Sequence, residues 1–270
     1  MLRILTVLIA LLILSTAHAA EWHDVMSPSK FGEAEIIRGE LHLPAKETHG
    51  NGPFPAVVLM HGCGGLTPAV KQGLDAHADA LNEAGFAALI LDSFGPRNLA
   101  GGQVCENVDQ LVRMRHSRRA DAAGAHAFLA ERSDIDGANI FLMGQSNGAG
   151  TAVLAAQPSF AQATGTDAAF RAVAAFYPWC GSFDSYRLTT PLLILSGSED
   201  GWTPPASCAK RVGKMKGADY QVEVYDGATH SFDLPIERQE YAGQVVAGDA
   251  PAALAARARM IAFFRENMAR

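Results

Sequence analysis

The sequence predicts an α/β fold in which a mostly parallel sheet is covered by helices on both faces. Short apolar runs without polar alternation, which are typical of strands buried on both faces, recur along the chain. The clearest runs are 56–60, 87–91, 140–143 and 192–195, and weaker ones are 172–176 and 222–225. Stretches with helical spacing of apolar residues lie between these runs. Strands that alternate with helices favour a parallel sheet.

The composition favours one folded unit. The chain has 270 residues, of which 49% are hydrophobic and 19% are charged, and its formal net charge is −6. Such a composition supports a buried core and excludes disordered and collagen-like chains. The negative charge, without any basic block, disfavours a nucleic acid or an anionic membrane as partner. The sequence has no internal repeat or long linker, so we expect a single domain over residues 20–270.

Residues 1–19 are predicted to be a secretory signal peptide. Arg3 gives a positive start, residues 4–14 form an apolar run, and residues 17–19 are an A-x-A cleavage pattern. The run is too short for a membrane anchor, which needs roughly 20 apolar residues. We therefore expect cleavage near Ala19 or Ala20 and a periplasmic or secreted protein that is not attached to a membrane afterwards.

The remaining elements follow in order along the chain. Residues 35–43 alternate, as in a strand with one wet face, and residues 46–53 form a polar turn. Helices are predicted at 70–83, 117–131, 147–156, 205–216 and 252–268. The first of these helices has one apolar face, made by Leu74, His77, Ala78 and Leu81. Because the net charge is negative, we interpret four arginines around the start of the second helix as a solvated face paired with acids: Arg113, Arg115, Arg118 and Arg119.

A G-x-S-x-G motif lies directly between a buried apolar run and a helix, at residues 144–148. In that context the turn is so sharp that Gly144 and Gly148 are needed beside the serine. The turn lifts the hydroxyl above the sheet, at a helix N-terminus that favours developing negative charge. A plain Gly/Ser turn is the alternative, but the strand and helix around the motif favour Ser146 as a nucleophile.

A base and an orienting carboxylate are expected with this serine, because a hydroxyl becomes nucleophilic only when a base removes its proton. His230, in a loop after the run 222–225, is the only histidine that follows Ser146. We predict Asp200, in the loop after the run 192–195, as the carboxylate, since the chain order Ser, acid, His is typical of such sites. Glu199 and Asp226 are the competing carboxylates.

A glycine-rich turn, His61-Gly62-Cys63-Gly64-Gly65, follows the first buried run. It is similar to turns whose backbone N–H groups bind an oxyanion. We predict the N–H groups of Cys63 and of Asn147, the residue after the serine, as the oxyanion-hole donors. A simple tight turn or a phosphate loop is the alternative, but the GK[ST] sequence of a phosphate loop is missing.

The four cysteines favour two disulfides in an exported protein. Spacing alone leaves all three pairings open. We favour Cys180–Cys208, because both residues lie in loops that follow neighbouring predicted strands, with Cys63–Cys105 as the remainder. A zinc site at His61 and Cys63, or redox chemistry, would need a companion such as CxxC, which the sequence lacks. We therefore predict no metal.

Five motifs in a fixed order carry a family resemblance: 61–65, 92–97, 144–148, 200–204 and 229–232. From about residue 53 to the C-terminus, the chain resembles the dienelactone hydrolase family of α/β-hydrolases. The resemblance implies the α/β-hydrolase fold and hydrolysis of small esters or lactones without metal or organic cofactor. The founding enzyme of the family has a cysteine nucleophile and a carboxylate residue where this chain has Ser146 and His61. The chain is more similar to an exported branch of the family.

Three residues are candidate substrate contacts. Arg97 follows the run 87–91 on the expected rim of the site. It would either hold a substrate carboxylate bidentately or form a structural ion pair, and we favour the ion pair. Trp202, beside Asp200, is expected to line a pocket or only to pack, and His61 is the third candidate.

Together these residues predict an exported serine hydrolase that cleaves small carboxylic esters or lactones through an acyl-enzyme. A peptidase or thioesterase with the same triad is the alternative enzyme. A non-catalytic binding protein on the same fold is the alternative outside enzymes. We expect a small-molecule ester or lactone as the partner, and a monomer or weak homo-oligomer.

Overall fold

The computed structural model describes residues 20–28, 34–99 and 102–269, so the predicted signal peptide lies outside the described residues. The described chain is built around an eight-stranded sheet with the strand order β1-β2-β4-β3-β5-β6-β8-β10. Strands β1 and β2 pair antiparallel at one edge, β2 also pairs antiparallel with β4, and all later pairs are parallel. The eight strands are β1 (Glu21–Ser27), β2 (Glu35–His42), β3 (Phe54–Met60), β4 (Ala87–Asp92), β5 (Ile135–Gln145), β6 (Val173–Phe176), β8 (Leu192–Gly197) and β10 (Tyr220–Tyr225).

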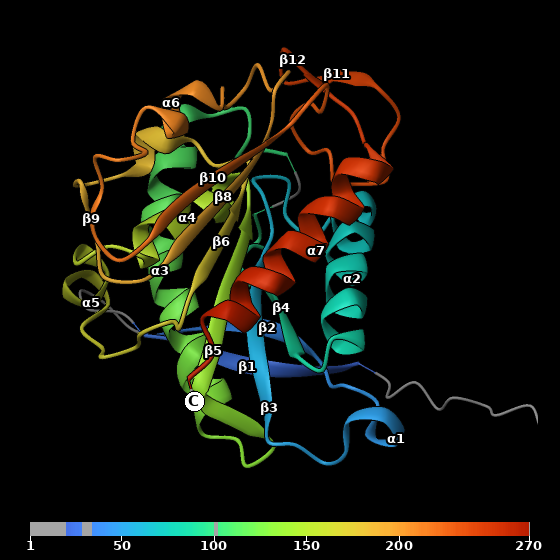
Figure 1. The fold of residues 1–270 in the computed structure, drawn as a ribbon, viewed down its shortest axis with the longest axis vertical. Helices are drawn as coiled ribbons and strands as arrows, with labels where there is room; N and C mark the ends of the chain where they lie inside the picture. Colours follow the sequence, from blue (N-terminus) through green and yellow to red (C-terminus); the bar gives the residue numbers. More distant parts are fainter. Residues whose placement is uncertain (1–19, 29–33, 100–101, 270) are drawn as a thin grey trace, which may run out of the picture.

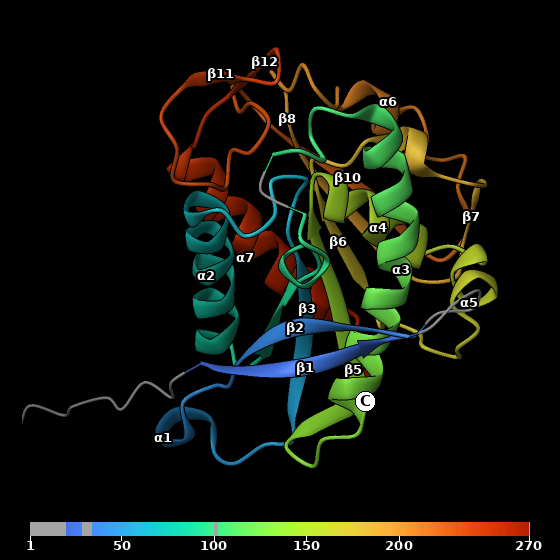
Figure 2. The same cartoon turned by 180° about the vertical axis from the view of Figure 1, so that it is seen from behind.

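Helices cover both faces of this sheet (Figures 1 and 2). Helices α2 (Pro68–Glu83) and α7 (Ala250–Glu266) pack on one face, and α3 (Val108–Ala130), α4 (Asn147–Ala155) and α5 (Ser159–Thr164) pack on the other. This three-layer arrangement confirms the predicted α/β-hydrolase fold class. The short elements are helices α1 (Lys46–His49), α6 (Ala206–Ala209), η1 (Gly95–Arg97) and η2 (Cys180–Ser182), and the strand pairs β7 (Arg187–Leu188) with β9 (Lys216–Gly217) and β11 (Gln239–Tyr241) with β12 (Gln244–Val246).

The sheet separates two hydrophobic cores. Along β3, Val57 and Leu59 join the core under α2 and α7, and Val58 and Met60 join the core under α3 and α4. All four side chains are fully buried. A strand buried on both faces has no polar position to alternate with, which explains the continuous apolar run in the sequence. Burying each such side chain stabilises the fold by about 1.5–3 kcal/mol.

The second and fourth predicted helices differ most from those in the structure, whereas the bounds of the others are within two residues. Helix α3 begins at Val108, nine residues before the predicted start at 117, because the Asn107 side chain caps it by accepting a hydrogen bond from the Gln110 N–H. The helix predicted at 205–216 is wrong beyond Ala209. The chain turns at Gly213, which has a positive φ of 73°, and then forms the short strand β9. Strand β1 was not predicted, because most of its side chains are exposed and it carries no apolar run.

The predicted solvated arginine face is also wrong in part. Arg113 is exposed, but Arg115 and Arg118 are buried, with exposed fractions of 7% and 0%. Both lie on the side of α3 that packs toward α4, where the sequence pattern alone gave no sign of polar burial.

In the described part of the chain, no helix has the length and apolar character needed to cross a membrane.

Candidate active site

Ser146 occupies the turn between β5 and α4, with φ 51° and ψ −111°. A non-glycine residue in this conformation stores about 1–3 kcal/mol of strain, and such strain is concentrated at functional sites. A Cβ atom on Gly144 would lie 2.3 Å from the Gly148 carbonyl oxygen, and one on Gly148 would lie 2.5 Å from the Met60 carbonyl oxygen. Only glycine fits on either side, so the sequence motif is explained by the closeness of β3, β5 and α4 at this turn.

The side chains of Ser146, His230 and Asp200 form one hydrogen-bonded chain. His230 Nε2 lies 3.0 Å from Ser146 Oγ, and His230 Nδ1 lies 2.8 Å from Asp200 Oδ2. An ionised carboxylate can only accept, so Nδ1 carries the proton and Nε2 of the neutral ring is free to accept the serine proton. The three residues follow β5, β10 and β8, at the carboxyl ends of parallel strands, where open α/β sheets bind their ligands.

Asp200 is held in place by several donors. Its Oδ1 accepts hydrogen bonds from the N–H groups of Trp202 at 2.9 Å and Thr203 at 2.8 Å, and Thr203 Oγ1 donates to Oδ2 at 2.8 Å. Burial alone would raise the pKa of Asp200, but the hydrogen bond from His230, its charge and the bonds from Thr203 more than offset burial and lower the pKa. Asp200 therefore stays ionised and faces the imidazole as a fixed negative charge.

The glycine-rich turn lies against Ser146. A Cβ atom on Gly62 would lie 3.3 Å from Ser146 Cβ, so a larger residue would crowd the serine. Cys63 and Asn147 line the same cavity as Ser146. In the part of the chain that the structure describes, neither of their backbone N–H groups donates a hydrogen bond to the protein. The Asn147 N–H belongs to the first turn of α4, which has no intrahelical acceptor.

Both predicted cysteine pairs are bonded in the structure. Cys63 is bonded to Cys105, 42 residues later, and Cys180 to Cys208, 28 residues later. The first disulfide ties the glycine-rich turn to the segment that leads into α3. The second ties η2 to α6, just after the Asp200 loop. Both therefore brace loops that surround Ser146.

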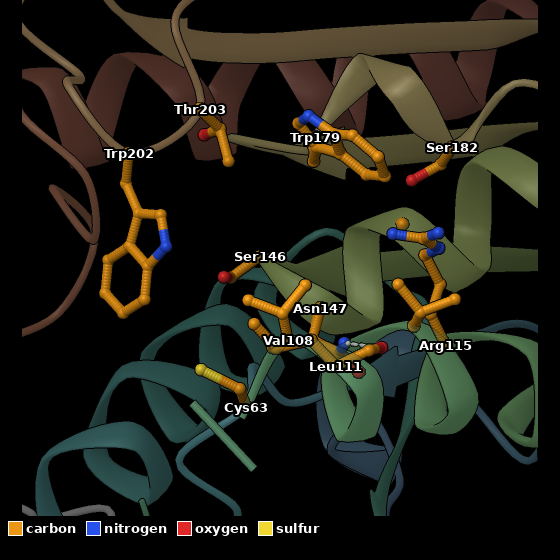
Figure 3. Close-up of a pocket in the computed structure, with 12 residues that line it drawn as sticks. Cys63, Val108, Leu111, Arg115, Ser146, Asn147, Trp179, Ser182, Trp202 and Thr203 are labelled. Carbon is orange, nitrogen blue, oxygen red and sulfur yellow. Dashed lines mark hydrogen bonds between the residues drawn. The ribbon is translucent and has the colours of Figure 1, made fainter. Parts of the chain in front are cut away.

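Ser146 lines two cavities, of which Figure 3 shows the first. The first cavity, of about 220 Å³, runs between α3, α4 and η2, and its lining includes Leu111, Arg115 and Trp179. The second cavity, of about 280 Å³, lies between the glycine-rich turn, the His230 loop and the β11–β12 hairpin. Trp202 lines both cavities, and its ring lies 5.0 Å from that of His230 between centroids.

The comparison with family models agrees with this geometry. The model of the dienelactone hydrolase family matches residues 38–268. The chain belongs to the dienelactone hydrolase family. No curated protein matches it at the level of sequence. Membership of this family makes the protein a hydrolase and agrees with the resemblance seen in its five motifs.

Solved structures of dienelactone hydrolase-like proteins have the same fold. A promiscuous phosphotriesterase of this kind from metagenomic libraries is 21% identical, with a TM-score of 0.68, over 93% of this chain and 100% of that chain. A dienelactone hydrolase-like protein from Klebsiella pneumoniae is 18% identical, with a TM-score of 0.66, over 92% of this chain and 100% of that one. A thermophilic esterase from Thermogutta terrifontis is 16% identical, with a TM-score of 0.59, over 95% of this chain and 97% of that one.

His61, a candidate substrate contact, is buried beside the glycine-rich turn of this dienelactone hydrolase family member and does not reach either cavity. Its ring is fully buried; Nδ1 lies 2.6 Å from the Gly62 carbonyl oxygen and Nε2 lies 3.3 Å from the Ser93 nitrogen. A carbonyl only accepts and an N–H only donates, so Nδ1 carries the proton. Burial and the nearby Arg118 charge lower the pKa of His61, which keeps it neutral. It lines neither cavity and instead braces the glycine-rich turn.

Arg97 is also not a substrate contact in the structure. Its guanidinium donates to both carboxylate oxygens of Asp121 at 2.8 Å, to Glu35 at 2.7 Å and to the Ser93 carbonyl at 2.8 Å. Burial alone would lower the pKa of Arg97, but these carboxylates raise it. The ion pair that we favoured is therefore present, and the donors that a substrate carboxylate would need are already used.

A buried polar network behind the site was not predicted. The Asp233 carboxylate is fully enclosed and receives hydrogen bonds from His77 Nε2 at 2.7 Å, Gln145 Nε2 at 2.7 Å and the Tyr177 hydroxyl at 2.5 Å. The ring of Tyr177 packs edge-on against His230, at 4.6 Å between centroids. The only signal in the sequence was His77 on the apolar face of a predicted helix, since its partner is 156 residues away.

A group of acids that could suggest a metal site lies outside the active site. Oxygens and a nitrogen of Glu40, His42 and Asp75 lie within 4.8 Å of one another. The ammonium group of Lys71 lies 2.8 Å from Glu40 and 2.5 Å from Asp75, so it occupies the position that a cation would take. This cluster is a partly buried ion-pair group formed by α2 and β2.

Proposed function

We propose that this hydrolase cleaves small carboxylic esters or lactones, with Ser146 as nucleophile, His230 as general base and Asp200 as the residue that orients it. The observation that carries the proposal is the chain of contacts at 3.0 and 2.8 Å that joins the strained serine to a buried carboxylate through one imidazole. Nucleophilic catalysis by serine needs this arrangement, because the hydroxyl is a weak nucleophile until a positioned base accepts its proton.

The first half of the reaction forms an acyl-enzyme. Ser146 Oγ attacks the ester carbonyl carbon while its proton passes to His230 Nε2, and the carbonyl oxygen becomes an oxyanion. We assign the binding of that oxyanion to the N–H groups of Cys63, in the turn, and Asn147, at the N-terminus of α4, which have no acceptor among the described residues. The tetrahedral intermediate then collapses, the bond to the alcohol oxygen breaks, and the proton on Nε2 passes to that oxygen.

The second half releases the acid. A water molecule takes the place of the alcohol and gives its proton to His230 Nε2 as it attacks the acyl carbonyl. When this intermediate collapses, Ser146 Oγ leaves with the proton and the carboxylic acid is free. Asp200 stabilises the imidazolium in both halves without taking its proton. The oxidation state of no group changes, so the chemistry needs no further reactant.

The two cavities suggest where the acyl and alcohol parts of the ester bind. His230 must protonate the leaving alcohol, so the alcohol side lies in the second cavity, which His230 lines. The acyl side then lies in the first cavity, which extends from Ser146 toward α3 and η2. At about 220 and 280 Å³, both spaces fit small groups rather than long chains.

The test is hydrolysis of short- and long-chain p-nitrophenyl esters by the mature protein and by Ser146→Ala. We expect rapid turnover of short chains by the wild type and a loss of about 10³–10⁶-fold in kcat for the variant. Ser117→Ala, at an exposed serine of α3 that lines neither cavity, is the matched control and should keep its activity. If the wild type were inert and Ser146 did not react with a fluorophosphonate probe, a binding protein would be the better reading.

We also propose that the protein acts outside the cytoplasm. Two disulfides around one site support this location, because structural disulfides persist in oxidising compartments.

A peptidase or thioesterase would use the same triad. Peptide and thioester substrates assayed beside the p-nitrophenyl esters distinguish these activities.

A further inference from the structure

The end of the first cavity farthest from Trp202 contains buried polar groups that have no partner. Arg115 is 7% exposed and Ser182 is 3% exposed, and both line the cavity that contains Ser146. Arg115 Nε and Ser182 Oγ have no hydrogen-bond partner among the described residues. Leaving a buried polar group unpaired costs about 1–3 kcal/mol, and more for a charged one. Two such groups at one end of a cavity indicate that a ligand bound there accepts their hydrogen bonds.

The cation of Arg115 forms no ion pair in the described structure. Its guanidinium stacks on the ring of Trp179, at 4.8 Å from the centroid. The charge of Asp184 acts on Arg115 without an ion pair between them, and the Asp184 carboxylate accepts a hydrogen bond from Ser159 at 2.6 Å. Arg97 differs, because its guanidinium is fully engaged by Asp121 and Glu35.

The surrounding chain keeps space for a ligand beside these two groups. A Cβ atom on Gly150 would lie 2.5 Å from Arg115 Cδ and 3.1 Å from Ser182 Oγ, so the glycine lets both side chains reach the cavity. Ser182 ends η2, which the Cys180–Cys208 disulfide anchors. In Figure 3, Arg115 and Ser182 face the same end of the cavity, and Ser146 lies between them and Trp202.

We propose that Arg115 and Ser182 bind a carboxylate at the far end of the acyl group, so that the preferred substrates are half-esters of dicarboxylic acids. The proposal rests on the function proposed above, in which the acyl side lies in the first cavity. A guanidinium offers a planar pair of donors that matches a carboxylate, and the hydroxyl offers a third donor. The apolar wall between Ser146 and Arg115, which includes Val108 and Leu111, suits the methylene chain that joins the two carbonyl groups.

The experiment compares charged and neutral acyl chains of the same shape. The substrates are the monoethyl esters of succinic, glutaric and adipic acids, with ethyl 4-methylpentanoate as the neutral isostere of the succinate half-ester. Hydrolysis is followed by titration of released acid, with wild type, Arg115→Met, Ser182→Ala and Arg113→Met. Arg113 is exposed on the same helix and does not line the cavity, so Arg113→Met removes the same charge elsewhere on α3.

The readout is the ratio of kcat/KM for the half-ester to kcat/KM for the neutral isostere. We expect this ratio to fall by about 10- to 100-fold in Arg115→Met and by about 3- to 10-fold in Ser182→Ala, because a charge-assisted hydrogen bond is worth more than a neutral one. Arg113→Met should keep the ratio within about twofold, and Arg115→Lys should restore part of it. A wild-type ratio near one, or equal ratios in the two arginine variants, would overturn the proposal.

A binding measurement separates this proposal from the esterase proposal. Titration calorimetry with succinate, glutarate and adipate, the acids released from the half-esters, needs no turnover. Binding that weakens about tenfold or more in Arg115→Met, but not in Arg113→Met, supports the subsite even if no ester is cleaved. Ester hydrolysis that requires Ser146 but shows no dependence on Arg115 in either assay removes the subsite and leaves the esterase in place.

Discussion

In the part of the chain that the structure describes, two buried histidines each pair with an aspartate, and one of these pairs faces a serine. His230 lies 2.8 Å from Asp200, and His77 lies 2.7 Å from Asp233. The second nitrogen of His230 lies 3.0 Å from Ser146 Oγ at the junction of two cavities. The second nitrogen of His77 has no partner among the described residues, and its ring packs on Phe176 in the core.

The difference shows that a His–Asp pair is not in itself a catalytic device. Both carboxylates are buried, and both have a pKa held below the ordinary value because donors, led by the paired histidine, outweigh the effect of burial. What distinguishes the pairs is the third group. Ser146 gives His230 a proton to accept, whereas Asp233 is enclosed by Tyr177 and Gln145 and stabilises the packing behind the site.

Replacing the carboxylate of the first pair should have the largest effect. In Asp200→Asn, Nδ1 loses the acceptor that sets its tautomer, so we expect kcat for ester hydrolysis to fall by about 10³–10⁴-fold. The free energy of unfolding should change far less than the rate. Steady-state kinetics and urea unfolding of the same preparation check this, with Asp79→Asn, at an exposed aspartate of α2, as control. A small loss of kcat would favour Glu199 or Asp226 as the orienting acid.

Replacing the carboxylate of the second pair should act on stability instead. Asp233→Ala leaves His77, Gln145 and Tyr177 without their shared acceptor, and breaking a buried pair in this way costs about 3–5 kcal/mol. Urea unfolding measures this loss directly. The variant that remains folded should still be labelled at Ser146 by a fluorophosphonate. If stability were unchanged and labelling were lost, Asp233 would belong to the catalytic machinery.

The stability of the protein should decrease in acid because of both pairs. A carboxyl group whose pKa is lower in the folded state contributes stability that is complete above the unfolded pKa of about 3.9 and is lost as pH falls through the folded pKa. Asp200 and Asp233 both have lowered pKa values, so the free energy of unfolding should decline below about pH 4. Asp233→Asn should reduce the slope by at most about 1.4 kcal/mol per pH unit. An unchanged slope would contradict a lowered pKa at Asp233.

The smallest effect is expected at Thr203, which supports only the first pair. Its hydroxyl has one proton and lies 2.8 Å from Asp200 Oδ2 and 3.0 Å from the Tyr177 carbonyl oxygen. Thr203→Val removes one hydrogen bond worth about 1 kcal/mol, so kcat should fall by about tenfold or less. Measurements of kcat across the pH range test this. Loss of the Thr203 hydrogen bond removes one cause of the lowered pKa of Asp200, so the acid limb of the profile should move to higher pH. Thr203→Ser, which keeps the hydroxyl, should recover most of the rate.

The parts of the fold that the sequence predicted are those with local causes. The strands β3, β4, β5 and β8 were visible as apolar runs because each is buried on both faces. The turn at Ser146 was visible because two glycines must flank it. His230 was identified because no other histidine follows the serine, and its place beside Ser146 in the structure agrees with that reasoning.

The parts that the sequence did not predict depend on partners far away along the chain. The ion pair favoured for Arg97 is present, but its partners could not be named from the sequence, because Asp121 lies 24 residues later and Glu35 lies 62 residues earlier. Arg115 and Arg118 are one turn apart in a basic stretch and were interpreted as solvated. Burial lowers the pKa of Arg118 to about 10, and its Nη1 donates to the Asn147 side chain at 3.2 Å. Only the packing of α3 against α4 shows this.

The disulfide between Cys63 and Cys105 links the redox state of the compartment in which the chain folds to the geometry of the proposed oxyanion hole. The amide of Cys63 is one of the two proposed oxyanion donors, and its sulfur fixes the turn that carries this amide. In a reducing cytoplasm the newly made chain would lack this tie and the one at Cys180. Its glycine-rich turn would then be free to move. Under the location proposed above, the turn that carries this amide would be fixed only once the chain had reached an oxidising compartment, so esters inside the cell would be spared.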